Sequence, residues 1–201
     1  QIERPSRVVF DIDPDEGLDF AAVREAARDL RDRLAIFGLA TYPLVTGGKV
    51  VAGVTHLPML GETFWAERGG GAWFNGQPIR VSGQTELLSS ILAVGIPFAG
   101  KPRHEQFVAE MERLTPRVLG LRRLGAAAVD MAYVACGRFD AYWEQSLNAW
   151  DMAAGVVIVE EARGVVTDTL GQPLDLFGGT VLASTPQLHS ELVEALAPVD
   201  G

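Results

Sequence analysis

Cysteine is almost missing from this sequence of 201 residues, in which Cys136 is the single example. One thiol cannot form a disulfide within the chain, and such cysteine usage is typical of the reducing cytoplasm. The neighbours of Cys136 in the sequence are small and apolar, so we expect a buried residue and not a nucleophile. The sequence therefore predicts a cytoplasmic protein that does not depend on thiol chemistry.

Long apolar runs and an excess of positive charge are missing as well. No run approaches the roughly twenty apolar residues that cross a bilayer, and no signal-peptide pattern opens the chain. The 26 acidic residues outnumber the 17 basic ones, which gives a formal net charge of −9. A general nucleic-acid surface is basic. We therefore expect neither a membrane nor a nucleic acid as a partner, and the three scattered histidines show no zinc spacing.

The hydrophobic pattern predicts an α/β fold, a layered sandwich in which an antiparallel sheet is followed by alternating strands and helices. Strand-like runs at 50–55, 63–66 and 79–81 are separated by glycine-rich turns, which is typical of an antiparallel meander. From residue 91 onward, strands and helices alternate. The expected strands are 91–94, 139–143, 165–167 and 180–183, and the expected helices are 104–114, 126–135, 186–196 and one beginning at Asp151. Ligands of such folds bind at the carboxyl ends of strands.

Residues 1–49 have the pattern of a β-α-β unit. An apolar run at 8–12 suits a buried strand, and apolar residues from Val23 to Phe37 recur at helical spacing. The pair Gly47-Gly48 separates two β-rich runs, 40–46 and 49–55, which is a hairpin signal.

Four acidic residues are candidates for a site. Asp151 is expected as the N-cap of an Ala- and Val-rich helix, an end that can also hold a phosphate and, through the carboxylate, a hard cation such as Mg²⁺. Glu144 ends an aromatic strand. The alternative is that Asp151 only caps the helix and Glu144 is only solvated. Asp11 and Asp13 would share one strand face, where close carboxylates favour a bound cation. The alternative for this pair is a local turn, because Asp is common in turns.

Several motifs in order resemble the inositol monophosphatase family over about three quarters of the chain. Residues 150–155 read Trp-Asp-Met-Ala-Ala-Gly, and residues 161–164 read Glu-Ala-Arg-Gly where the family has Glu-Ala-Gly-Gly. Further matching stretches are 51–54, 67–76 (Glu-Arg-Gly-Gly-Gly-Ala-Trp-Phe-Asn-Gly), 79–82, 125–131 (Gly-Ala-Ala-Ala-Val-Asp-Met) and 137–142.

The resemblance implies a fold, a reaction and a set of site residues. Asp151 would be a metal ligand, and Glu144 would bind a hydroxyl of a small sugar or cyclitol phosphate. Gly125, Ala126 and Ala127 would present backbone N–H groups to the substrate, although tight helix packing alone also explains such small residues. Magnesium would polarise the phosphate and lower the pKa of the attacking water. The family also implies a possible homodimer.

The front of the chain departs from that family. Its members begin with a helical region and an Asp-Pro-Ile/Leu-Asp-Gly-Thr strand end, whereas residues 13–18 here read Asp-Pro-Asp-Glu-Gly-Leu. Residues 4–17, with Asp11 and Asp13, and residues 46–49 (Thr-Gly-Gly-Lys) resemble the primase-like polymerase domain of bacterial DNA-repair ligase D, whose Asp-x-Asp binds metals. We therefore expect two segments, 1–49 and 50–201, joined as in a chimera near residues 47–51.

Three functions follow as hypotheses. The first is a Mg²⁺-dependent phosphomonoesterase, impaired because front motifs are missing, with a metal site formed by Asp151, Asp13 and Asp11. The second is a natural or engineered chimeric scaffold without catalytic activity. The third is nucleotide binding through Asp11 and Asp13.

Overall fold

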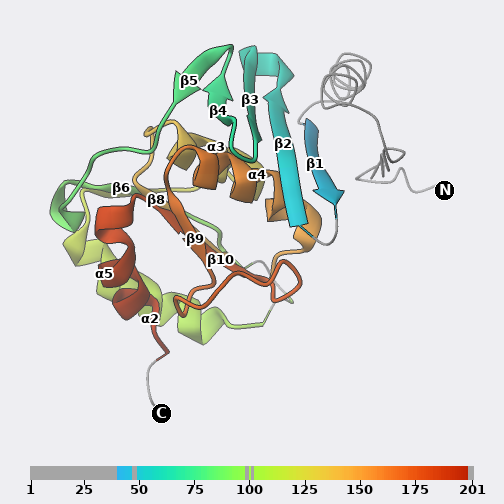
Figure 1. The fold of residues 1–201 in the computed structure, drawn as a ribbon. Coiled ribbons are helices and arrows are strands. Elements are labelled where there is room, and N and C mark those ends of the chain that lie inside the picture. Colours follow the sequence, from blue (N-terminus) through green and yellow to red (C-terminus); the bar gives the residue numbers. More distant parts are fainter. Residues whose placement is uncertain (1–39, 47–48, 98–99, 101, 199–201) are drawn as a thin grey trace.

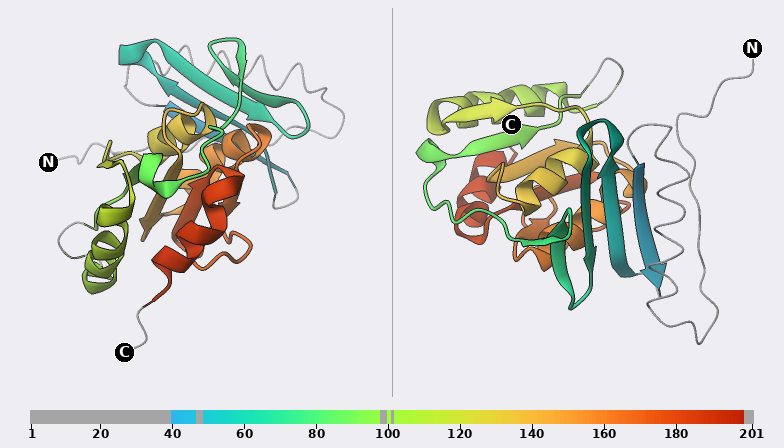
Figure 2. Two further views of the ribbon diagram at one scale, coloured as in Figure 1. Left: turned by 90° about the vertical axis from the view of Figure 1, so that its left-hand side faces the viewer. Right: turned by 90° about the horizontal axis from the view of Figure 1, so that it is seen from above.

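The computed structural model describes residues 40–46, 49–97, 100 and 102–198. The strand and helix expected within residues 1–39, together with Asp11 and Asp13, lie outside the described residues. The described part has four layers: a first sheet, a pair of helices, a second sheet and a second pair of helices (Figure 1). Figure 2 shows the same order of layers from above. The predicted α/β sandwich is thus confirmed.

The first sheet is an antiparallel meander of five strands in sequence order. Its strands are β1 (Ala40–Thr46), β2 (Lys49–Leu57), β3 (Glu62–Glu67), β4 (Gly71–Phe74) and β5 (Gln77–Ile79). Thr46 pairs with Lys49, so the predicted hairpin is confirmed. The short strand β4 was not expected. It lies between Gly70 and the Asn75-Gly76 turn, where both residues have positive φ and the chain reverses.

The second sheet is mixed and has the strand order β7-β6-β8-β10-β9. Its strands are β6 (Ile91–Val94), β7 (Gly120–Arg122), β8 (Ala141–Gln145), β9 (Val165–Thr167) and β10 (Thr180–Ser184). Strand β6 runs parallel to β7 and β8, whereas β10 runs antiparallel to β8 and β9. The carboxyl end of β6 therefore meets the carboxyl end of β8 at one edge of the sheet.

Two helices separate the sheets and two more cover the outer face of the second sheet (Figures 1 and 2). The inner pair is α3 (Ala127–Ala135) and α4 (Ala149–Glu161), and the outer pair is α2 (His104–Leu114) and α5 (Pro186–Leu196). Three short 3₁₀ turns, η2 (Pro58–Leu60), η3 (Leu87–Ser89) and η4 (Thr115–Arg117), lie in connections. No helix within the described ranges has the length and apolar character needed to cross a bilayer.

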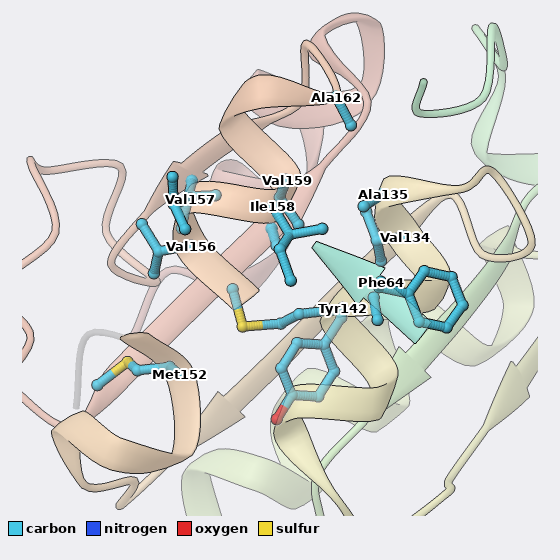
Figure 3. Close-up of a cluster of buried hydrophobic side chains, with 14 of the residues drawn as sticks. Phe64, Val134, Ala135, Tyr142, Met152, Val156, Val157, Ile158, Val159 and Ala162 are labelled. Carbon is cyan, nitrogen blue, oxygen red and sulfur yellow. The ribbon is translucent and has the colours of Figure 1, made fainter. Parts of the chain in front are cut away.

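Helix α4 is apolar on all sides because it lies between the two sheets. Every residue from Met152 to Val159 is buried, which is expected of a helix without a polar face. Figure 3 shows Val156, Ile158 and Met152 of α4 packed with Tyr142 and Phe64 in this core. Gly155 allows α3 to approach, since a Cβ there would lie 2.7 Å from the sulfur of Met131.

A second apolar cluster fills the space between the second sheet and α2 and α5. Trp143, Leu182 and Leu188 belong to it, whereas Tyr142 belongs to the core between the sheets. Side chains alternate along a strand. Strand β8 therefore points Tyr142 and Glu144 toward α3 and α4, and Trp143 and Gln145 toward α2.

Candidate active site

The end of β8 positions Glu144 on the inner face of the second sheet. The hydroxyl of Tyr142, two residues earlier on the same face, donates a hydrogen bond to Oε2 of Glu144. Gly95 follows β6 and donates its backbone N–H to the carbonyl of Trp143 at 3.0 Å. A Cβ on Gly95 would lie 1.9 Å from Cδ of Glu144. Glu144 thus fits against its neighbours only because residue 95 has no side chain.

Three carboxylates influence the pKa of the Tyr142 hydroxyl. The pKa of Tyr142 is raised well above its ordinary value, first because the phenol is buried and next because Glu144 is negatively charged. Asp130 and Asp151 raise the pKa of Tyr142 further. Tyr142 therefore stays protonated as a donor, and the structure brings Glu144, Asp130 and Asp151 into one electrostatic neighbourhood.

Asp151 lies in the first turn of α4 but is not its N-cap, so that prediction is wrong. Asn148 is the N-cap, and Asp151 is the third helical residue. Oδ2 of Asp151 accepts the backbone N–H of Asn148 at 3.0 Å and its side-chain amide at 3.3 Å. The reason is that Asn is itself a favoured N-cap, and an acidic residue three positions later completes a capping box.

The stretch from Gly125 to Ala127 opens α3, as the resemblance implied. Gly125 has φ of 82°, a conformation that favours glycine. Ala126 is the N-cap and offers no side-chain hydrogen bond to the first turn. The positive end of the α3 dipole therefore has no capping side chain, which is the arrangement that suits an incoming anion.

Asp130 was missed in the sequence analysis. It lies in the first part of α3 with 1% of its surface exposed, and neither carboxylate oxygen makes a hydrogen bond of good geometry. Burial raises the pKa of Asp130 to about 7, and the nearby charge of Glu144 raises it as well. Backbone N–H groups of Leu124 and Ala126 act in the opposite direction. The available signal was a single acid in an otherwise apolar helix.

The oxygen donors here suit a hard cation only in part. Asp151 can supply one carboxylate ligand of the kind that Mg²⁺ prefers. Within the ranges described, no group of three or more His, Cys, Asp or Glu side chains is arranged to hold a metal ion. The other two predicted ligands, Asp11 and Asp13, lie outside the described residues. The described part therefore does not form a complete magnesium site.

The last motif, residues 161–164, has a structural role. The two carboxylate oxygens of Glu161 accept the backbone N–H groups of Gly69 and Gly71 at 2.9 and 3.0 Å. Helix α4 then ends in a Schellman motif, in which Arg163 donates to the carbonyl of Glu160 and Gly164 to that of Val159. These bonds connect the helix that carries Asp151 to the β3–β4 turn.

The layered sandwich, with acidic groups beside two helix N-termini, is the fold of the sugar phosphatases. A comparison with known families matches residues 43–200 to the inositol monophosphatase family. The chain belongs to that family.

Its relatives include named phosphatases. The inositol-1-monophosphatase of Caulobacter vibrioides is 45% identical over 152 residues, which cover 75% of this chain and 59% of that protein. The fructose-1,6-bisphosphatase/inositol-1-monophosphatase of Thermotoga maritima is 41% identical, over 77% of this chain and 58% of that protein. The Nus factor SuhB of Pseudomonas aeruginosa is 38% identical, over 75% and 56%.

Solved structures agree with the fold. The extragenic suppressor protein suhB of Bartonella henselae superposes with a TM-score of 0.78 at 40% identity, covering 81% of this chain and 62% of that one. The inositol monophosphatase of Anabaena (Nostoc) gives a TM-score of 0.75 at 39% identity, covering 79% and 63%. The chain thus spans less than two thirds of the length of these proteins.

Residues 1–59 match a different family, the primase-polymerase domain of LigD. The two matches overlap over residues 43–59, which include most of the β1–β2 hairpin. The resemblance of the front to that domain is thereby supported, and the junction near residues 47–51 stays a prediction.

Proposed function

We propose that the chain is a Mg²⁺-dependent phosphomonoesterase that acts on a small sugar or cyclitol phosphate. The observation that carries this proposal is the hydrogen bond from Tyr142 to Glu144 at the end of β8, where the charge of Asp151 also raises the pKa of Tyr142. Membership of the inositol monophosphatase family supports the reaction. The names of the Caulobacter vibrioides and Thermotoga maritima relatives support the class of substrate.

Each part of the site has a separate task in this proposal. The uncapped N-terminus of α3, at Ala126 and Ala127, binds phosphate oxygens through backbone N–H groups. Glu144 accepts a hydrogen bond from a substrate hydroxyl, and Tyr142 holds that carboxylate in place. Asp151 would be a ligand of the metal.

Electrostatics explain why a cation belongs here. The region that would receive an anionic ester is negatively charged, because Glu144 and Asp151 lie close enough to raise the pKa of Tyr142. A phosphate without a counterion would be repelled by these groups. Asp151 would hold a divalent cation, and such a cation would offset this repulsion and polarise the phosphate.

The front of the chain decides how fast the reaction runs. In this proposal Asp11 and Asp13 supply further metal ligands, and Leu18 replaces the threonine that in the family helps to orient the attacking water. Because Leu18 has no hydroxyl, we expect kcat to be lower than in the related phosphatases by roughly two orders of magnitude or more. The alternative is a chimeric scaffold without activity.

Phosphate release from myo-inositol 1-phosphate tests the proposal. The full chain is assayed with MgCl₂ and with EDTA, beside Asp151→Asn and a control, Glu112→Gln, at an exposed position of α2. We expect Mg²⁺-dependent release that Asp151→Asn reduces about 100-fold or more and Glu112→Gln leaves unchanged. Absence of release from the wild type at high enzyme concentration supports the inactive scaffold.

A further inference from the structure

Behind the candidate active site, on the other face of β8, lies a buried carboxylate. Glu110 of α2 is 0% exposed. Its Oε2 accepts the indole N–H of Trp143 at 3.0 Å. Its Oε1 accepts the side-chain amides of Gln145 at 2.6 Å and Gln106 at 3.0 Å. Burial raises the pKa of Glu110, and these donors act in the opposite direction.

Two of these donors flank Glu144 in the sequence. Trp143 and Gln145 point toward α2, whereas Glu144 points to the inner face, where Tyr142 donates to it. Glu110 therefore holds the β8 backbone on both sides of Glu144. Inside the sheet, the carbonyl of Trp143 also accepts the N–H of Gly95.

The space beside this strand end is not completely filled. A small cavity lies beside Glu110, lined by Gly95, Pro97, Pro102, Arg103, Phe107, Trp143 and Gln145. Removing the carboxylate would leave the buried indole N–H of Trp143 and the half-buried amide of Gln145 without this acceptor, which costs more than the bonds contributed. The donors would then move toward water and take the strand end with them.

We propose that Glu110 is a positioning residue that fixes Glu144 for recognition of a substrate hydroxyl. This inference rests on the proposed function, in which Glu144 binds that hydroxyl. A displacement of about 1 Å at such a group can cost roughly 100-fold in rate. Glu110 never touches the substrate, and its effect is confined to substrates that carry a hydroxyl for Glu144.

The test compares Glu110→Leu with the conservative Glu110→Gln in the full chain. Leucine removes both acceptor oxygens. Glutamine keeps one acceptor for Trp143. Its amide can donate to the Oε1 of Gln145, which is now buried without a partner, once the Gln145 amide has flipped to face it. Glu112→Leu makes the same change of charge at an exposed position of the same helix and is the control.

The first measurement is amide hydrogen exchange in the peptide that contains residues 142–146. We expect Glu110→Leu to raise exchange there about 10-fold and to leave α4 unchanged, with Glu110→Gln and Glu112→Leu close to wild type. Unchanged exchange in Glu110→Leu would overturn the proposal whatever the activity.

The second measurement compares two esters. We expect Glu110→Leu to raise KM for myo-inositol 1-phosphate about 10-fold, and to leave kcat/KM for p-nitrophenyl phosphate, which has no hydroxyl, within about twofold. Equal losses with both esters would reject the role in hydroxyl recognition. If the wild type hydrolyses neither ester, the proposed function fails, and the exchange experiment alone still decides whether Glu110 holds the strand end.

Discussion

Tyr142 and Glu144 are joined by a hydrogen bond along the inner face of β8, with the buried phenol as donor and the carboxylate as acceptor. Burial and three acidic neighbours raise the pKa of Tyr142, so the phenol stays protonated and remains a donor at neutral pH. Glu144 is thus oriented by a phenol that is itself fixed in the core.

Replacing Tyr142 by Phe should release Glu144 without emptying the core. The ring stays, and only the hydroxyl is lost. We expect KM for myo-inositol 1-phosphate to rise about 10-fold, because a hydrogen bond to a charged group contributes roughly 1.5 kcal/mol. Steady-state kinetics with p-nitrophenyl phosphate as the second substrate provides the control, and an equal loss there would show that Tyr142 acts on something other than hydroxyl binding.

A methyl group at residue 95 should displace Glu144. The Cβ of Gly95→Ala would overlap the Glu144 carboxyl group, so the side chain must move from its present position. We expect kcat/KM for myo-inositol 1-phosphate to fall about 10-fold or more. Gly83→Ala is the matched control, since a Cβ there meets nothing within 4 Å. Similar kinetics for the two variants would mean that the position of Glu144 is unimportant.

The sequence predicted the layers and most elements of the described part because its patterns are local. The hairpin at Gly47-Gly48, the helix at 104–114 and the strand at 165–167 are present as expected. The short strand β4 was missed, since its four residues are too few to show a period, and its pairing with β3 depends on the turn before it.

The candidate site was predicted less completely than the fold. Glu144 lies at the end of a strand and residues 125–127 open α3, as predicted, whereas Asp151 was assigned to the N-cap, a position that Asn148 occupies. The roles of these residues stay predictions. Asp130 and Glu110 were not predicted. Both are buried acids whose roles depend on side chains from other elements, such as Glu144 for Asp130 and Trp143 for Glu110. Such contacts have no signature in a single sequence.

Asp130 should make the stability of the fold depend on pH. The pKa rises from an ordinary 3.8 to about 7, so between these values the folded chain binds more protons than the unfolded chain. Stability is therefore greatest below about pH 4 and falls as the pH rises toward about 7. Asp130→Asn removes this loss and should gain stability relative to wild type, on the order of a few kcal/mol, between about pH 4 and pH 8.

Urea denaturation of both proteins in EDTA across that pH range measures the difference. Parallel stability curves for wild type and Asp130→Asn would contradict the assigned cause.

Arginine at position 163 should make the folded protein less stable than glycine would. It has φ of 67° and occupies the left-handed residue of the Schellman motif that ends α4. We expect Arg163→Gly to raise the free energy of unfolding by about 1 kcal/mol. Thermal melts measure this difference. The comparison is Arg80→Gly, at an exposed residue that does not have positive φ, where glycine should bring no such gain. A lower melting temperature for Arg163→Gly would show that the arginine side chain contributes more than its backbone conformation costs.

In the proposed function, the first turn of α4 and the start of α3 form one pocket for a cation and a phosphate ester. Anomalous diffraction from crystals of the full chain soaked in manganese and inorganic phosphate tests it most directly. We expect a manganese peak at the Asp151 carboxylate, with phosphate density near Ala126 and Ala127, and loss of the peak in Asp151→Asn. Crystals that show phosphate and manganese elsewhere, or no manganese at Asp151 under saturating conditions, would contradict it.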